Sequence, residues 1–396
     1  HMSTVTHNEA TTEHGIILIL AAVMPAMAII SLVPVMPLLS QEFSSVSNSE
    51  ALVPIALTIP ALCVAIFSPI AGLLSDRIGR KMLLLFGLLG YAAVGIIPFF
   101  LTNLFQIIGS RFVLGIFEAV IMTVSTALIG DYFKGDAREK WIGIQIGAVS
   151  VSAIILIALG GALGEFLGSR GPFLLYLIAL PIALLVFLKL FEPRAIEKTS
   201  ASGKNLPWKT LLPLLIITLA VGVFFYTVIV SLGDILLLVE EVSPAQIGLI
   251  GAAVNLGVMI AASSFIKLKG NSSGPKLLAI GFALFSIGYV GMGVSSSIAG
   301  SVTAAIITSL GAGFLLPCML AWVMSILEAG DRGKGTGLWT GMFFLGQFVA
   351  PLVVVALSGP LAGLSNVLVF YGITAAVLMV AALWASRGAE PLRQNT

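Results

Sequence analysis

The sequence predicts an all-α membrane protein, with twelve transmembrane helices arranged in two six-helix bundles. Three observations support this fold class: long apolar runs, an alternation of basic and non-basic connections, and an echo between the two halves of the chain. Of the 396 residues, 58% are hydrophobic and only 10% are charged, and the mean hydropathy is +1.10. Because this leaves too little polar surface to cover a water-soluble globule, we place the chain in a membrane.

Twelve apolar runs are long enough to cross a bilayer, since a hydrocarbon core of about 30 Å needs roughly 20 residues of helix. The runs are continuous and rich in Leu, Ile, Ala and Gly, without the alternating polarity of a membrane β-barrel, so helices are the remaining way to span. The predicted spans are 15–38, 51–74, 82–101, 104–130, 141–164, 173–191, 210–238, 245–268, 276–296, 299–327, 336–359 and 364–386.

Basic residues follow a strict alternation along these spans. Of the 20 Lys and Arg residues, all except Arg111 and Arg170 fall in even-numbered connections or in the C-terminal tail. Short connections rich in Lys and Arg stay on the cytoplasmic side of a membrane. We therefore expect both termini in the cytoplasm, and a bacterial cytoplasmic (inner) membrane as the location.

The long polar connection in the middle of the chain divides it into two halves. A six-residue pattern, R-x-K-x-x-G, occurs at 138–143 and again at 332–337, at the same point of each half, which favours an internal duplication. The expected organisation is an N-terminal tail with a cloning remnant at 1–14, a first bundle at 15–191, a cytoplasmic linker at 192–209, a second bundle at 210–386 and a cytoplasmic tail at 387–396.

A charged stretch, GLLSDRIGRK at 72–81, stands between the second and third spans. Its glycines allow close helix approach and a tight reversal, and Asp76 is placed where it could accept hydrogen bonds from a helix N-terminus. The order of Gly72, Leu73, Asp76, Arg77, Gly79, Arg80 and Lys81 resembles the cytoplasmic loop motif of the major facilitator superfamily.

That resemblance implies a conformational latch on the cytoplasmic side. Asp76 would face the start of the eleventh span, near Thr336 and Gly337, and Arg80 would pair with Asp131 at the end of the fourth. Such a cluster would favour one state of a two-bundle machine that rocks. The full set of expected latch residues is Gly72, Asp76, Arg77, Gly79, Arg80 and Asp131.

One acid lies deep in the predicted membrane. Glu118 is about 13 residues from the cytoplasmic end of the fourth span, or roughly 20 Å along a helix. An ionised residue there costs about 2.5 to 3.5 kcal/mol, so we expect it to be functional. Helical spacing joins Arg111, Gly115, Glu118, Met122 and Ser125 in one stripe, which we expect to face a water-filled cavity.

We expect Glu118 and Arg111 to couple transport to protons, since substrate arrival or gate movement could change the protonation of a carboxyl beside an arginine. The alternative is a permanent ion pair that only holds helices together. Arg111, Leu114 and Gly115 also resemble the helix 4 motif R-x-x-Q-G of the drug and proton antiporter branch, which implies a place for Arg111 near the proton and substrate site. The run 160–165 lacks the proline of that branch's helix 5 motif, although its glycines still permit close packing.

Other candidates are polar or aromatic residues within spans. Asp234, at the expected outer rim, is a further candidate for proton coupling. A large apolar cavity with a few polar groups suits amphiphilic organic molecules. The side chains that we expect to line it are Met122, Ser125, Tyr226, Asn255, Trp339, Phe343 and Gln347.

The expected function is proton-coupled efflux of amphiphilic small molecules, such as drugs, metabolites or a siderophore, by alternating access. The alternative is a uniporter or a proton symporter that takes up a small organic anion. The chain has no phosphate-binding G-x-x-x-x-G-K-[ST] pattern and its three histidines all lie in the first fourteen residues, so we expect neither an enzyme nor an ATP-driven pump. The expected partners are a small-molecule substrate, protons and membrane lipid; we expect a monomer without cofactor, metal or nucleic acid.

Overall fold

The computed structural model describes residues 9–193, 205–328 and 331–392. Within these ranges the chain is built of helices, with one isolated bridge between Ser273 and Pro391 and no β-strand. The all-α membrane fold class is thereby confirmed. Most of the expected linker, the extreme N-terminus and the last four residues of the expected tail lie outside the described residues.

The first half contains six passes, and its first pass is broken into short pieces by Pro25, Pro34 and Pro37, which lack the N–H that a continuous helix needs. The elements are α1 (Thr12–Val23), η1 (Met24–Ala26), α2 (Met27–Ile30), η2 (Val33–Val35), α3 (Met36–Glu42), α4 (Ser49–Ile78), α5 (Arg80–Gly95), η3 (Ile97–Phe100), α6 (Leu104–Tyr132), α7 (Asp136–Leu167), η4 (Gly168–Ile178) and α8 (Ala179–Lys189).

The second half follows the same plan with fewer breaks. Its predicted first span, 210–238, divides at Ser231, so that the spanning helix ends at Val230, eight residues earlier than expected, and a separate short helix follows. The elements are α9 (Trp208–Val230), α10 (Leu232–Leu237), α11 (Pro244–Lys269), α12 (Gly274–Val294), α13 (Ile298–Ser325), α14 (Arg332–Ser358) and α15 (Leu364–Ala385).

Eleven helical stretches in the described residues are long and apolar enough to cross a membrane. One of them runs for 54 residues, from Asp136 to Lys189, and contains both α7 and the return pass formed by η4 and α8. Gly168 joins these two passes with a φ of +77°, a conformation that glycine adopts without strain. Counting both passes, the described part of the chain contains twelve passes.

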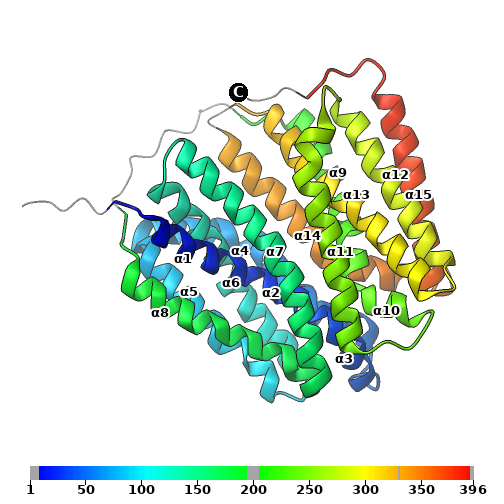
Figure 1. Cartoon of the computed structure of the whole chain (residues 1–396), viewed down its shortest axis with the longest axis horizontal. Coiled ribbons are helices and arrows are strands. Elements are labelled where there is room, and N and C mark those ends of the chain that lie inside the picture. Colours follow the sequence, from blue (N-terminus) through cyan, green and yellow to red (C-terminus); the bar gives the residue numbers. More distant parts are fainter. Residues whose placement is uncertain (1–8, 194–204, 329–330, 393–396) are drawn as a thin grey trace, which may run out of the picture.

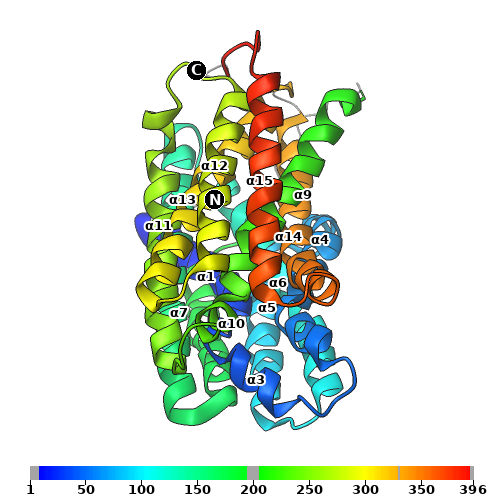
Figure 2. The same ribbon diagram turned by 90° about the vertical axis from the view of Figure 1, so that its right-hand side faces the viewer.

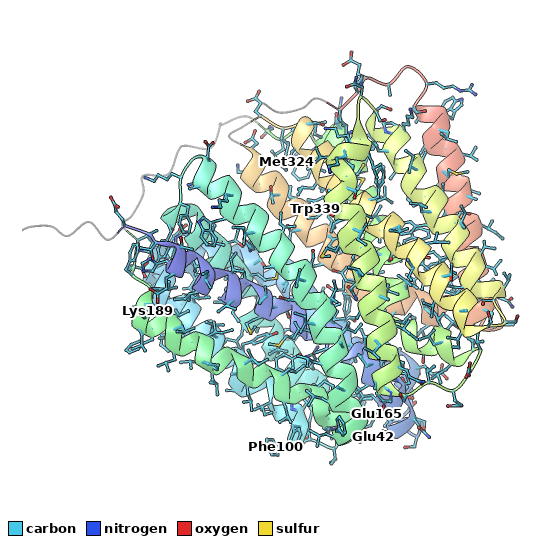
Figure 3. The ribbon with its side chains drawn as sticks, in the orientation of Figure 1. Glu42, Phe100, Glu165, Lys189, Met324 and Trp339 are labelled. Carbon is cyan, nitrogen blue, oxygen red and sulfur yellow. The ribbon has the colours of Figure 1, made fainter. Side chains whose placement is uncertain are left out.

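Side-chain contacts tie the helix ends together at two faces. We call one the basic face: there Arg80 pairs with Asp131, and the His14 ring lies 3.1 Å from the carbonyl of Lys189. We call the other the opposite face: there Arg170 pairs with Glu42. Figure 3 shows Glu42, Glu165 and Phe100 together at the opposite face.

The two bundles meet most closely at the opposite face. Figure 1 shows α7 and α11 side by side there and diverging toward the basic face, and Figure 2 shows the second bundle from its own side. A Cβ atom added to Gly161 would lie 2.6 Å from the Pro244 carbonyl oxygen, so the backbones are in direct contact. Toward the basic face, a Cβ added to Gly147 or Gly341 would meet no described atom within 4 Å. The molecule is therefore closed at the opposite face.

Candidate functional site

The Glu118 carboxyl lies buried where the two bundles meet. Its residue is 2% exposed, and its Oε2 atom has no hydrogen-bond partner among the described residues. The residues within its electrostatic reach include Cys63 on α4 and, from the other bundle, Tyr226 on α9. Since a buried polar atom without a partner is costly, this carboxyl is available for a proton or a ligand.

On the second bundle, aromatic side chains of α9 and α14 pack around Tyr226 and form a wall of the candidate site. The Tyr226 and Phe343 ring centroids are 5.2 Å apart, and the rings of Phe343 and Trp339 stack at 5.5 Å with an interplanar angle of 4°. Two further polar atoms on α14, Trp339 Nε1 and Gln347 Oε1, are buried without a partner among the described residues. The wall thus combines apolar area with one orphaned donor and one orphaned acceptor.

Arg111 lies elsewhere, inside the first bundle, and is 1% exposed. Its Nε donates to the Ala56 carbonyl at 2.8 Å, its Nη1 to the Tyr176 hydroxyl at 2.5 Å, and its Nη2 to the Leu57 carbonyl at 3.1 Å and to the Ala28 carbonyl. Four of its five N–H donors are therefore engaged. The ion pairs of the described residues do not include one between Arg111 and Glu118.

Two of the carbonyls that bind Arg111 are free because of local sequence. Pro60 has no N–H and cannot donate to Ala56 four residues earlier, as a helix requires. The amide of Leu32 donates to Ile29 at 2.9 Å, in the tighter 3₁₀ pattern, which leaves Ala28 without its helical donor. The guanidinium thus satisfies carbonyls that broken helices expose.

The expectation of one cavity-lining stripe along α6 is wrong in part. Arg111 is enclosed by its own bundle, and a Cβ added to Gly115 would lie 2.5 Å from Cys63 Cβ and 2.8 Å from Pro60 Cα, so this segment packs tightly on α4. Glycine is needed there for close helix approach rather than for a water-filled cavity. Glu118 is the member of the stripe that reaches the junction.

Two of the other cavity candidates, Ser125 and Asn255, are less available than expected. The Ser125 hydroxyl is buried and donates to Ile121 at 2.6 Å, and the Asn255 amide donates to Gly251 at 2.9 Å, both within their own helices. Met122 is half-buried on α6. The back-bonded polar groups have fewer free sites for a substrate than Trp339 and Gln347.

Asp234 is not part of the Glu118 site. It lies in the short helix α10, beyond the end of α9, and lines a cavity of ≈ 300 Å³ at the opposite face together with Glu50 and Ser40. Burial raises the pKa of the Asp234 carboxyl above its usual range. The structure therefore separates this acid from the one at the junction of the bundles.

The charged stretch 72–81 forms a compact cluster on the basic face. Arg80 Nε lies 2.5 Å from Asp131 Oδ2, the expected ion pair, and its Nη2 lies 3.4 Å from Asp76 Oδ1. Gly72 is half-buried and Arg77 is exposed. At Gly79, with a φ of +98°, the chain turns from α4 into α5. The pairing is confirmed, and the role of the cluster as a latch stays a prediction.

Sequence reasoning missed several residues that the structure places in these sites. The Glu192 carboxylate accepts from the backbone N–H groups of Arg80 at 2.7 Å and Lys81 at 2.8 Å, which caps the N-terminus of α5. Tyr176 binds Arg111, and no local pattern marks it. Pro60 did carry a signal, since a proline inside a spanning helix always frees the carbonyl four residues before it.

Comparison with known proteins gives a consistent picture. The family model of the Major Facilitator Superfamily matches residues 18–266 and 214–396. The tetracycline resistance protein, class H, of Pasteurella multocida is 34% identical over 48% of this chain, and the match spans only 46% of that protein. The multi-drug resistance efflux pump PmrA of Streptococcus pneumoniae is 27% identical over 83% of this chain and 84% of the pump.

Solved structures share the fold at low sequence identity. A bacterial homolog of the human lysosomal transporter Spinster, in an inward-facing and occupied conformation, has a TM-score of 0.78 at 15% identity, over 96% of this chain and 99% of that one. A D-xylose-proton symporter has a TM-score of 0.77 at 15% identity, over 97% and 99% of the two chains.

The twelve-pass fold, with its orphaned polar atoms at the junction of two bundles, defines an integral membrane transporter and not an enzyme. The chain belongs to the Major Facilitator Superfamily. The resemblance to its drug and proton antiporter branch is confirmed by the similarity to a tetracycline resistance protein and to a multi-drug resistance efflux pump.

Proposed function

We propose that the protein exports amphiphilic small molecules, such as drugs, metabolites or a siderophore, by alternating access and in exchange for protons. The observation that carries this proposal is the buried carboxyl of Glu118, unpartnered at Oε2 among the described residues and within electrostatic reach of Tyr226 from the other bundle. The similarity to a protein named as a multi-drug resistance efflux pump supports the direction of transport.

Glu118 is the proton carrier in this proposal. An uncompensated charge in a buried site is costly, so the carboxyl gains by binding a proton or by meeting a cationic group of a substrate. The two events compete for one group, and that competition is a physical basis for exchange. Arg111 acts on Glu118 only through its field, from within the first bundle.

The second bundle supplies substrate contacts. The stacked rings of Trp339 and Phe343 and the ring of Tyr226 offer apolar area, while Trp339 Nε1 and Gln347 Oε1 offer one donor and one acceptor. Sites with large apolar walls and few polar groups accept varied amphiphilic molecules. We also propose that the transporter works as a monomer in a bacterial inner membrane, with the basic face toward the cytoplasm.

The alternative, uptake of a small organic anion held by Arg111, has less support. The guanidinium has four of its donors engaged by carbonyls and by Tyr176, so an anion would have to displace them. The fold itself serves exporters and importers alike.

The test is transport by purified protein in liposomes with an imposed pH gradient and a panel of amphiphilic cations and neutral compounds. We expect the Glu118→Gln variant to lose gradient-driven accumulation by at least tenfold, because the amide cannot exchange a proton, and to keep binding the compounds that wild type binds. Substrate accumulation by Glu118→Gln at the wild-type rate and with the same gradient dependence would contradict the proposal.

The matched control is Glu9→Gln, which changes the same atoms at an exposed position ahead of α1. It should transport as wild type does. Counterflow of protons with substrate favours antiport, whereas movement of both in the same direction, or indifference to the gradient, favours the uptake alternative.

A further inference from the structure

The charged stretch at 72–81 has a second copy in the same bundle. GLLSDRIGRK aligns without gaps with GALGEFLGSR at 161–170. Five positions agree in kind: a leading glycine, a leucine two residues later, an acid at position five, a glycine at position eight and a cation at position ten. The first copy lies on the basic face and the second on the opposite face.

The copies also agree in structure. Each acid stands two residues before the end of its helix, since α4 ends at Ile78 and α7 ends at Leu167. Each following glycine has a positive φ, +98° at Gly79 and +77° at Gly168.

A cation ties each turn to an acid of its own bundle. On the basic face Arg80, at position nine of its stretch, pairs with Asp131, and on the opposite face Arg170, at position ten, pairs with Glu42, with Nη1 and Oε2 2.8 Å apart. Each ion pair thereby fixes the turn that follows the acid in the last helical turn.

The second acid makes a contact between the bundles. Glu165 Oε2 accepts a hydrogen bond from the backbone N–H of Ala245 at 3.1 Å. Ala245 lies in the first turn of α11, a 26-residue helix, where N–H groups lack helical partners and the helix dipole favours a negative charge. Gly161, four residues before Glu165, brings the backbones together against Pro244.

We propose that Glu165 is the latch residue of the opposite face, the counterpart of Asp76 on the basic face. Each acid would hold the N-terminus of one helix of the second bundle, Glu165 that of α11 and Asp76 that of α14. In this structure the opposite-face latch is engaged. The proposal rests on the alternating access of the proposed function, because two latches can alternate only in a molecule that opens first at one face and then at the other.

The test measures conformation rather than transport. Spin labels at Thr102→Cys and Ser296→Cys, exposed positions of the two bundles on the opposite face, report the distance across that face in a Cys63→Ala, Cys318→Ala background. We expect Glu165→Ala to raise the ratio of open to closed molecules about threefold to tenfold, the effect of losing one charged helix-terminal contact. Glu165→Gln should have a smaller effect and Glu165→Lys a larger one.

The control is Glu240→Ala, which removes an exposed acid from the same face and should leave the distances unchanged. Distances that are the same in wild type, Glu165→Ala and Glu165→Lys overturn the inference. That outcome would not bear on the proposed function. The proposed function is tested by the proton-driven transport of Glu118→Gln, and the latch is tested by the spin-label distances.

Discussion

At the scale of single residues, Arg111 shows how a buried cation can be held without an ion pair. Its donors go to backbone carbonyls of α2 and α4 and to the Tyr176 hydroxyl. Each carbonyl carries only a partial charge, but together they surround the guanidinium with acceptors. The residue therefore joins three passes of the first bundle, and two of its acceptors are carbonyls that helix breaks leave without a helical donor.

We expect Arg111→Met to destabilise the protein by about 2 to 5 kcal/mol, because the carbonyls of Ala28 and Ala56 would be buried without donors. Thermal melting of the detergent-solubilised protein measures this. Adding Pro60→Ala should recover part of the loss, since residue 60 would then donate its own N–H to Ala56. A melting temperature that Arg111→Met leaves unchanged would show that the carbonyls find other partners.

At the scale of elements, the packing of α7 on α11 decides which face is closed. Glycines replace side chains along the contact: a Cβ at Gly161 would lie 2.9 Å from Gly248 Cα, and one at Gly248 would lie 2.8 Å from the Ile157 carbonyl oxygen. Small residues let two helices approach to backbone contact, where many weak attractions add up.

We expect Gly161→Val to keep the opposite face from closing, since its side chain would overlap the Pro244 carbonyl. Thiol labelling of Ile157→Cys measures this, because Ile157 is fully buried in the closed arrangement. Labelling should become several times faster. Gly147→Val is the matched control in the same helix, at a position with open space, and should leave the rate as it is.

At the scale of the whole molecule, the structure carries a cluster of charged side chains at the basic face and another at the opposite face. The basic-face cluster of Asp76, Arg80 and Asp131 is assembled within the first bundle, and Glu192 at the start of the interbundle connection caps α5 beside it. Charges near the end of a rocking structure shift its equilibrium most effectively when they contact the other half in only one state.

We expect Asp76→Asn to shift the population further toward the state open at the basic face. Labelling of Gly341→Cys, where a side chain has open space, should increase by about twofold to tenfold, as for one helix-terminal charge. Equal labelling with and without Asp76→Asn would count against the latch. Glu9→Gln again serves as the control for an acid lost from the basic face.

The sequence predicted the passes well because the bilayer sets their length and every backbone polar group inside it must be satisfied locally. Glu118 could be found for the same reason, since an acidic residue within a long apolar run is unfavourable in the hydrocarbon core and therefore stands out in the sequence. The breaks in the first pass and after Val230 were not predicted in detail, because hydropathy does not distinguish a continuous helix from short helical pieces of equal apolarity.

By itself, therefore, the sequence determined that this is a twelve-pass, all-α membrane protein with a deep acid and a charged turn. These features follow from the polarity of each local segment compared with that of the hydrocarbon core. Only the tertiary structure decided that Arg111 binds carbonyls instead of Glu118, that Glu118 faces the second bundle, and that Glu165 reaches α11. Those contacts join residues far apart in the chain, and the partners of Arg111 Nε and of Glu165 are backbone atoms that carry no sequence identity of their own.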